Sequence, residues 1–285
     1  MKFRAEHIRF SHRARHEPPR EVFGDLTLAV SPGECVGILG REGSGKTTLL
    51  NLLGGLVPPS GGRLLIDDID PHAGGRGRGA IRLRMGFTFQ FPEEQFLRQT
   101  VGEEFGDMLR LRGVPAGEVP QLMKEALARM GLDSPEVPER SPFSLSLGES
   151  RRLALALLVA GRPAAALLDE PTAGLDASGA ACTLKALGGL RSAGVTIIVA
   201  THDVNLLAGI AGRVLILDGG GIGVDGGAGD VLRDGALLAS HGYGLPDSAP
   251  LSGDSRQSGG GDERDGQHGN DISRVDGGNP EGGSR

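Results

Sequence analysis

Cysteine is scarce in this sequence: its 285 residues include two, Cys35 and Cys182. They lie far apart in the chain, and neither has a nearby Cys or His at the spacing of a metal-ligand set. Two cysteines are too few for a disulfide framework, and a zinc site needs such neighbours. We therefore exclude both and expect the two cysteines to be buried as small apolar side chains. A chain of this length can bury a sizeable core without either device.

Excess positive charge and long apolar runs are missing as well. The formal net charge is -6 at pH 7, which leaves no global basic field for gripping nucleic acid, so we expect no nucleic-acid partner. No apolar run reaches about 18 residues, the length that crosses a bilayer. The N-terminus also lacks the basic and then apolar layout of a signal peptide. The chain is thus expected to start in the cytosol, and any work at a membrane needs another subunit to hold it there.

The composition changes near the C-terminus. From residue 247 onward Gly, Ser, Asp, Asn and Arg dominate, and large apolar side chains are almost absent. Such a segment cannot bury enough surface to offset the entropy of ordering it. We expect residues 1–246 to form one globular domain and 247–285 to be a disordered tail, either inert or functional.

Short apolar runs have the length and branching of buried parallel strands. They are residues 36–39, 165–168, 196–200 and 214–217. Helical patterns lie between them, as at 48–56 and 119–130, and the glycine-rich stretch 74–79 predicts a loop. Each apolar run leads into a polar turn. Since open α/β sheets bind ligands at the carboxyl ends of their strands, these turns are expected to converge on one site.

A phosphate-binding pattern, G-x-x-x-x-G-K-[ST], joins the first apolar run to the helix that follows. Its residues are Gly40, Arg41, Glu42, Gly43, Ser44, Gly45, Lys46 and Thr47, with Thr48 next in the chain. In such a loop, backbone N–H groups and the helix N-terminus hold the phosphates. Lys46 is expected to reach the β and γ oxygens and the Thr47 hydroxyl to ligate Mg²⁺. Alone, the pattern specifies only a nucleoside triphosphate, because kinases, GTPases and motors use it too.

Two adjacent carboxylates, Asp169 and Glu170, end the run at 165–168. Asp169 is expected to hold Mg²⁺ through water, and Glu170 to polarise the water that attacks the γ-phosphate. A solvated acidic pair is the alternative. It is common for an isolated Asp-Glu, but less so after four apolar residues.

With these motifs in this order, residues 3–240 resemble the ATP-binding cassette superfamily. The resemblance implies an α/β fold: a P-loop NTPase core with a mainly parallel sheet, an N-terminal antiparallel β subdomain, and an α-helical signature subdomain at about 92–160. It also implies a face-to-face dimer. Each ATP is then clamped between the phosphate loop of one subunit and the signature segment of the other.

The resemblance assigns roles to three further residues. Gln90 is similar to the glutamine that senses Mg²⁺ and the attacking water. Asp176 resembles the aspartate that crosses the dimer interface, and His202 resembles the switch histidine that contacts the γ-phosphate. Taken singly, Gln90 and His202 would be ordinary polar residues at strand ends.

Two places depart from the family pattern. Residues 145–149 read Leu-Ser-Leu-Gly-Glu, where the family usually has Leu-Ser-Gly-Gly-Gln. Ser146 and Gly148 can still donate to the γ-phosphate of the partner's ATP, whereas Leu147 adds a side chain that crowds the nucleotide or restricts the backbone. His12 stands where relatives often carry a tyrosine stacked on adenine. An imidazole can stack with less area, and a place in a surface loop is the alternative.

Residues 89–96, residues 141–144 and the pair Arg151-Arg152 resemble the energy-coupling factor and cobalt-type ATPases. That resemblance implies a peripheral protein at the cytoplasmic face of the cell membrane. Its partners would be integral membrane transport subunits and a second ATPase, and the transported substrate a vitamin or a metal ion. Leu147 favours a second ATPase that is a relative rather than a copy, with unequal sites.

Two other functions compete with transport. A soluble cassette ATPase acting on nucleic acid or ribosomes is the alternative, although the sequence has neither heptads nor a second phosphate loop. A P-loop kinase would leave the signature segment and Asp176 without a role. Transport explains the whole set of motifs.

Overall fold

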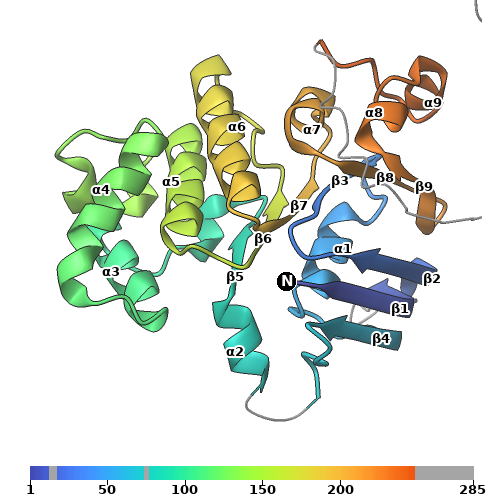
Figure 1. Ribbon diagram of the computed structural model, residues 1–285, viewed down its shortest axis with the longest axis horizontal. Coiled ribbons are helices and arrows are strands. Elements are labelled where there is room, and N and C mark those ends of the chain that lie inside the picture. Colours follow the sequence, from blue (N-terminus) through green and yellow to red (C-terminus); the bar gives the residue numbers. More distant parts are fainter. Residues whose placement is uncertain (13–17, 74–76, 248–285) are drawn as a thin grey trace, which may run out of the picture. The chain divides into compact units, whose positions relative to one another are not determined.

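Two β-sheets organise the structure, a computed structural model that describes residues 1–12, 18–73 and 77–247 (Figure 1). The larger sheet has the strand order β5-β6-β7-β3-β8-β9. Its first five strands pair in parallel, and β9 is antiparallel to β8. The strands are β3 (Cys35–Gly40), β5 (Met85–Thr88), β6 (Ala165–Asp169), β7 (Thr196–Ala200), β8 (Arg213–Asp218) and β9 (Gly221–Gly227).

The four apolar runs fall within β3, β6, β7 and β8, so their prediction as parallel strands is confirmed. Every residue of β3, β6 and β7 is buried. This pattern is typical of parallel strands covered on both faces.

The smaller sheet is antiparallel, with the order β2-β1-β4, which confirms the predicted N-terminal antiparallel part. It consists of β1 (Phe3–His12), β2 (Arg20–Val30) and β4 (Gly61–Ile66). Its apolar face shares a core with helix α1 (Lys46–Leu53) and with strands of the larger sheet. Phe3, Phe23 and Leu53 of this core are fully buried. The phosphate loop is therefore held between two sheets.

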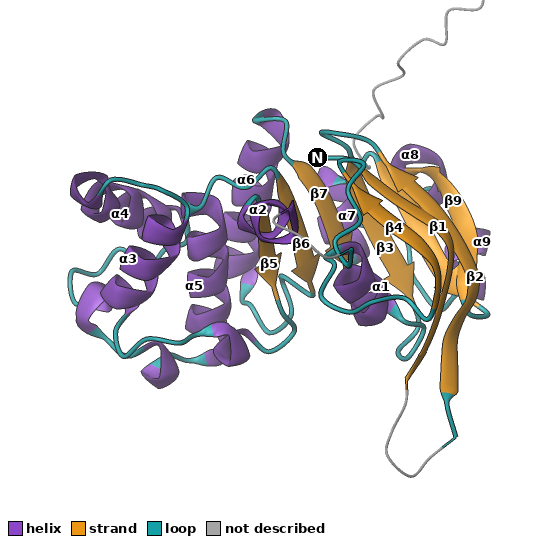
Figure 2. Cartoon of the chain, turned by 90° about the horizontal axis from the view of Figure 1, so that it is seen from below, coloured by secondary structure: helices purple, strands orange, loops and turns teal. Residues whose placement is uncertain are grey.

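Helices α3 and α4 lie on the far side of α5 from the larger sheet (Figure 2). The longer helices are α3 (Val101–Leu111), α4 (Val119–Arg129), α5 (Leu147–Ala160) and α6 (Ala177–Ser192). The shorter helices are α2 (Gly77–Leu83), α7 (Val204–Ile210), α8 (Ala228–Val231) and α9 (Gly235–Ser240), with 3₁₀ turns η1 (Pro92–Gln95), η2 (Ala116–Glu118), η3 (Val137–Glu139) and η4 (Pro142–Ser144). Helices α3 to α7 pack into a second core with the other face of the sheet.

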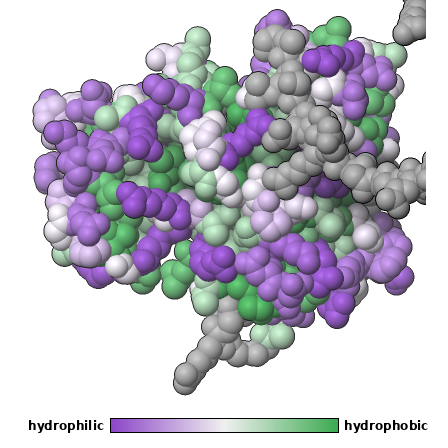
Figure 3. Space-filling view, in the orientation of Figure 1, coloured by the Kyte–Doolittle hydropathy of each residue, from purple (hydrophilic) through white to green (hydrophobic). Residues whose placement is uncertain are grey.

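On the face seen in Figure 3, hydrophilic residues spread over the region of α3 and α4 and over the smaller sheet. Among the described residues, no helix has both the length and the hydropathy needed to cross a membrane.

The predicted glycine-rich loop, the predicted burial of the two cysteines and the predicted C-terminal tail have different outcomes. The loop expected at 74–79 is wrong for 77–79, where α2 begins, and residues 74–76 lie outside the described residues. Cys35 is 4% exposed, as expected, and its burial raises the pKa of the thiol to about 12. Cys182, on α6, is only partly buried, so that prediction is wrong. Of the expected tail, residues 248–285 lie outside the described residues.

Candidate active site

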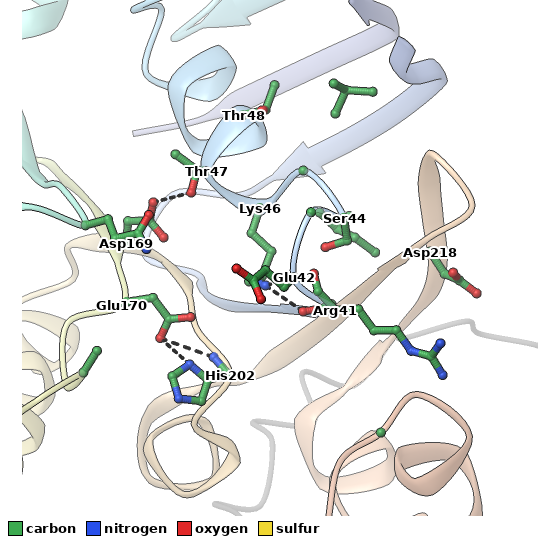
Figure 4. Close-up of a pocket in the computed structure, with 18 of the residues that line it drawn as sticks. Arg41, Glu42, Ser44, Lys46, Thr47, Thr48, Asp169, Glu170, His202 and Asp218 are labelled. Atoms are coloured by element: carbon green, nitrogen blue, oxygen red, sulfur yellow. Dashed lines mark hydrogen bonds and ion pairs between the residues drawn. The ribbon is translucent and has the colours of Figure 1, made fainter. Parts of the chain in front are cut away.

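The carboxyl ends of β3, β6 and β7 open into one cleft with a volume of about 1140 Å³ (Figure 4). Most of the predicted site residues line it, as expected for ligand binding in an open α/β sheet. They are Gly40, Arg41, Glu42, Gly43, Ser44, Gly45, Lys46, Thr47, Thr48, His12, Gln90, Asp169, Glu170 and His202. The exceptions are Ser146, Gly148 and Asp176.

The phosphate loop curls around its own lysine. Lys46 Nζ donates to the carbonyl oxygens of Gly40 at 2.6 Å and Arg41 at 3.3 Å. Gly45, directly before α1, has a φ of 100°, and a Cβ there would lie 2.8 Å from the Phe23 ring. Both facts require glycine at this position. The loop thus leads straight into a helix N-terminus, where backbone N–H groups favour anions.

Thr47 and Asp169 form an oxygen pair at the edge of the cleft. The Thr47 hydroxyl donates to Asp169 Oδ2 at 2.6 Å. Asp169 is 5% exposed, and burial raises the pKa of its carboxyl, which the bond from Thr47 partly offsets. Hydroxyl and carboxylate oxygens are ligands that Mg²⁺ prefers, and it usually completes its shell with water and substrate phosphates. The pair therefore fits a magnesium ion, although no group of three or more His, Cys, Asp and Glu suited to a metal occurs among the described residues.

Glu170 is held by residues at the end of the neighbouring strand β7. Its Oε2 accepts a bond from the Thr201 hydroxyl at 2.9 Å, and His202 Nδ1 lies 2.9 Å from the same oxygen (Figure 4). Because β6 and β7 are parallel neighbours, with Asp169 opposite Ala200, the residues that follow each strand meet. Glu170 has a φ of 48°, a conformation uncommon outside glycine that clusters at functional sites.

Gln90, between β5 and η1, is tied to helix α5. Its carbonyl oxygen accepts a bond from Arg151 Nη2 at 2.8 Å. Arg151 lines the cleft and is 6% exposed; burial lowers the pKa of its guanidinium, while the nearby charges of Glu170, Glu93 and Asp169 raise it. In the sequence Arg151 is merely part of a basic helix start, so its place in the cleft was missed.

His12 is the last residue of β1, and residues 13–17 beyond it lie outside the described residues. The histidine belongs to a strand and not to a loop. Its Nε2 is 3.3 Å from the Thr48 hydroxyl, and its ring meets Phe10 edge-on, with 5.1 Å between centroids. It therefore lines the cleft beside the start of α1, and its stacking on adenine stays a prediction.

Ser146, Gly148 and Asp176 are not brought to the phosphate loop of their own chain. Ser146 caps α5: its hydroxyl accepts from the Glu149 N–H at 3.3 Å, and the Glu149 carboxylate accepts from the Ser146 N–H at 2.9 Å. Asp176 caps α6 by accepting from the Gly179 N–H at 2.8 Å. Leu147, the first residue of α5, is 52% exposed and lines the cleft.

Tyr243, after α9, also lines the cleft, and sequence reasoning missed it. It belongs to no motif and follows the last apolar run by more than 25 residues. The sequence contains no signal that would place it beside residue 40.

Comparison with known proteins gives a consistent result. The family model described as ABC transporter matches residues 23–173. The energy-coupling factor transporter ATP-binding protein EcfA2 of Symbiobacterium thermophilum is 37% identical over 239 residues, which cover 84% of this chain and 83% of the relative. The cobalt import ATP-binding protein CbiO of Rhodobacter capsulatus is 40% identical over 226 residues, covering 79% of this chain and 80% of the relative.

Solved structures agree. The structure of cbiO1 from Clostridium perfringens, part of the ABC transporter complex cbiONQ, has a TM-score of 0.68 at 26% identity, covering 84% of this chain and 93% of that one. The ATP-binding cassette MJ0796, in a dimeric post-hydrolysis state with ADP and Pi, has a TM-score of 0.72 at 26% identity, covering 79% and 98%. The chain therefore belongs to the ABC transporter family, as a subunit that binds and hydrolyses ATP.

Proposed function

We propose that the chain is the ATP-hydrolysing subunit of an importer of the energy-coupling factor type, which takes up a vitamin or a metal ion through a membrane complex. The names of EcfA2 and CbiO, relatives that match over most of both chains, support this. The subunit would act at the cytoplasmic face of the membrane, bound to integral membrane subunits. It would not contact the transported substrate itself.

The phosphate loop supplies the nucleotide site in this proposal. The N–H groups at the start of α1 and the Lys46 ammonium would hold the β- and γ-phosphates, and His12, which lines the same cleft, would stack on adenine. Bound Mg²⁺ would neutralise charge on the phosphate oxygens. Thr47 and Asp169 would hold the ion, with Gln90 as a further oxygen ligand that also contacts the attacking water.

Glu170 is the general base in this proposal, and its bonding pattern is the observation that carries it. The bonds from Thr201 and His202 described above fall on Oε2. They fix the carboxylate and leave Oε1 to accept the proton of the attacking water. His202, 69% exposed, lines the cleft beside Glu170 and would contact the γ-phosphate.

A second ATPase subunit completes the site. Ser146, Gly148 and Asp176 lie outside the cleft of their own chain, which agrees with contacts to the ATP of a facing subunit. The dimeric MJ0796 cassette supports such an arrangement. ATP that contacts both subunits only when they are closed favours the closed dimer, and release of products lets it reopen.

The test is Glu170→Gln in the assembled membrane complex. Loss of the base should lower kcat by about 100-fold or more, while ATP affinity stays near that of the wild type and a closed dimer accumulates. Glu125→Gln, at an exposed position on α4, is the matched control and should leave turnover unchanged. Turnover of Glu170→Gln within threefold of the wild type would contradict the assignment.

A further inference from the structure

Arg151, on the second turn of α5, holds the main chain of Gln90. Its Nη2 donates to the Gln90 carbonyl oxygen at 2.8 Å, across 61 positions of the sequence. Gln90 follows strand β5, whose Thr88 lies opposite Leu168 of β6. Because these strands are parallel neighbours, Gln90 lies at the same edge of the sheet as Asp169, and both line the cleft. The hydrogen bond from Arg151 therefore anchors a residue beside the proposed magnesium site.

Arg151 is buried without a direct ion pair. It is 6% exposed, and its Nε has no hydrogen-bond partner among the described residues. The carboxylates of Glu170, Glu93 and Asp169 act on it through their charge and not through a hydrogen bond. Removing a guanidinium from water costs free energy, which close pairing with a carboxylate can offset. The specific contact that this buried cation makes is instead the hydrogen bond to Gln90.

Helix α5 gives Arg151 a rigid base. The next residue, Arg152, donates to the carbonyl oxygens of Met130 and Gly131 at 3.1 Å each, which ties α5 to the end of α4. All side chains at positions 153–160 are buried. Arg151 thus extends from a fixed helix to the connection between β5 and η1.

The charge of Arg151 and its hydrogen bond have opposite effects on a magnesium ion. A guanidinium near Asp169 repels a second cation from the same carboxylate. The hydrogen bond, in contrast, holds the main chain of Gln90, whose residue is exposed in the cleft. Groups that orient a metal ligand raise the affinity for the metal. The two effects therefore predict opposite results when Arg151 is replaced.

We propose that Arg151 is a positioning residue: through the Gln90 carbonyl it holds the Gln90 side chain where its oxygen binds the magnesium ion of MgATP. The inference rests on the proposed function, in which Gln90 is a metal ligand, and adds a residue that holds this ligand. Positioning outweighs the repulsion between the guanidinium and the metal. Arg151 therefore strengthens the part of nucleotide binding that depends on magnesium.

The decisive variant is Arg151→Met, which keeps a long side chain and removes the charge and the donors. Titration calorimetry on the purified full chain gives the affinity for the non-hydrolysable analogue AMP-PNP, once with excess Mg²⁺ and once with EDTA. We call the ratio of the two affinities the magnesium gain. It should fall about tenfold, the lower end of the loss when a group that orients a metal ligand is removed. A role through charge alone would raise the gain, because a lost cation favours another cation nearby.

Two variants control for folding and for chemistry. Arg152→Met makes the same substitution at the next residue of α5, which lies outside the residues that line the cleft. It should leave the magnesium gain within twofold of the wild type. Arg151→Lys keeps the charge and a donor, so it should recover most of the gain that Arg151→Met loses.

A double-mutant cycle tests whether Arg151 acts through Gln90. Gln90→Ala removes the proposed ligand and should lower the magnesium gain. Adding Arg151→Met to Gln90→Ala should not lower the gain any further, since no amide oxygen is left to position.

The outcomes separate the two proposals. Wild-type protein that does not bind AMP-PNP, or binds it equally with and without Mg²⁺, would overturn the proposed nucleotide site and with it the role of Arg151. A clear wild-type gain, together with an equal or larger gain in Arg151→Met, would overturn the role of Arg151 alone. A further fall in the Gln90→Ala background, or an equal fall in Arg152→Met, would overturn it too.

Discussion

The carboxyl edge of the larger sheet and the first turn of α5 use their polar groups in opposite ways. At the sheet edge, residues far apart in sequence bond each other: Thr47 with Asp169, and Thr201 with Glu170. At α5, Ser146 bonds Glu149 three residues away, and the next side chain, Leu147, is half exposed. At the sheet edge, hydrogen bonds thus join residues that are distant in the sequence. In the first turn of α5, neighbouring residues bond each other, and the Leu147 side chain is left half exposed. Under the proposed function, the polar groups of this second region would contact a nucleotide held by a facing subunit.

Lys46→Ala tests the assembled region and should have the largest effect. The variant removes the cation that the loop holds in the cleft. We expect ATP affinity to fall about 100-fold, since hydrogen bonds to charged groups contribute about 1.5–3 kcal/mol. Calorimetric titration measures it, with Lys124→Ala, at an exposed position on α4, as control. A loss below threefold would mean that the loop binds phosphate without its lysine.

Leu147→Gly tests the surface region in the paired assembly. If this signature segment serves the partner's ATP, removing the side chain should raise turnover at that site about three- to tenfold, or roughly 1 kcal/mol in the barrier. ATP affinity at the chain's own loop is measured as well, because Leu147 also lines that cleft. Turnover at each of the two ATP sites is measured alone by inactivating the general base of the other site. Leu111→Gly, at an exposed position that ends α3, is the control. Unchanged or lower turnover would remove Leu147 as the cause of unequal sites.

Glu149→Gln probes the cap of α5 and should have the smallest effect. The N–H of Ser146 holds the pKa of the Glu149 carboxyl below its usual 4.5, with Arg140 adding to the shift. A lowered folded-state pKa stabilises the fold above pH of about 4.5, and this stabilisation is lost as pH falls through the folded-state value. The substituted glutamine amide would keep the cap but would not titrate.

The measurement is urea unfolding of both proteins from pH 7 into the acid range. The wild type should be more stable at pH 7 by less than about 1 kcal/mol, because the pair is partly exposed. The difference should shrink on acidification. If the difference in unfolding free energy between the two proteins stays constant with pH, the charge on residue 149 does not contribute to the stability of the cap.

Local patterns account for what the sequence predicted well. Residues 165–168 are apolar and short, and they form a buried strand because both faces are covered. The glycine pattern at 40–47 demands a particular backbone wherever it occurs, so the loop follows from its own residues. Because β6 and β7 are parallel neighbours, Glu170 and His202, which follow these two strands, lie side by side.

What escaped prediction depends on docking between distant elements. Arg151 reaches the Gln90 carbonyl across 61 residues only because α5 packs beside η1 and β5. Tyr243 reaches Gly40 because the segment after α9 returns to the end of β3. Neither contact is marked in the sequence by a characteristic spacing of residues. The start of α2 at Gly77 was missed for another reason, because glycine has a low helix propensity that neighbouring packing can override.

The burial of Cys35 has a practical consequence for labelling chemistry. Thiolates, not thiols, attack maleimides, and a pKa of about 12 keeps Cys35 protonated at neutral pH. Cys182, partly exposed on α6, then reacts first. A spin label or fluorophore can thus be attached at one native position, on the helix that Asp176 caps. In a dimer of two copies of this chain, the distance between two such labels would follow opening and closing during turnover without any engineered cysteine.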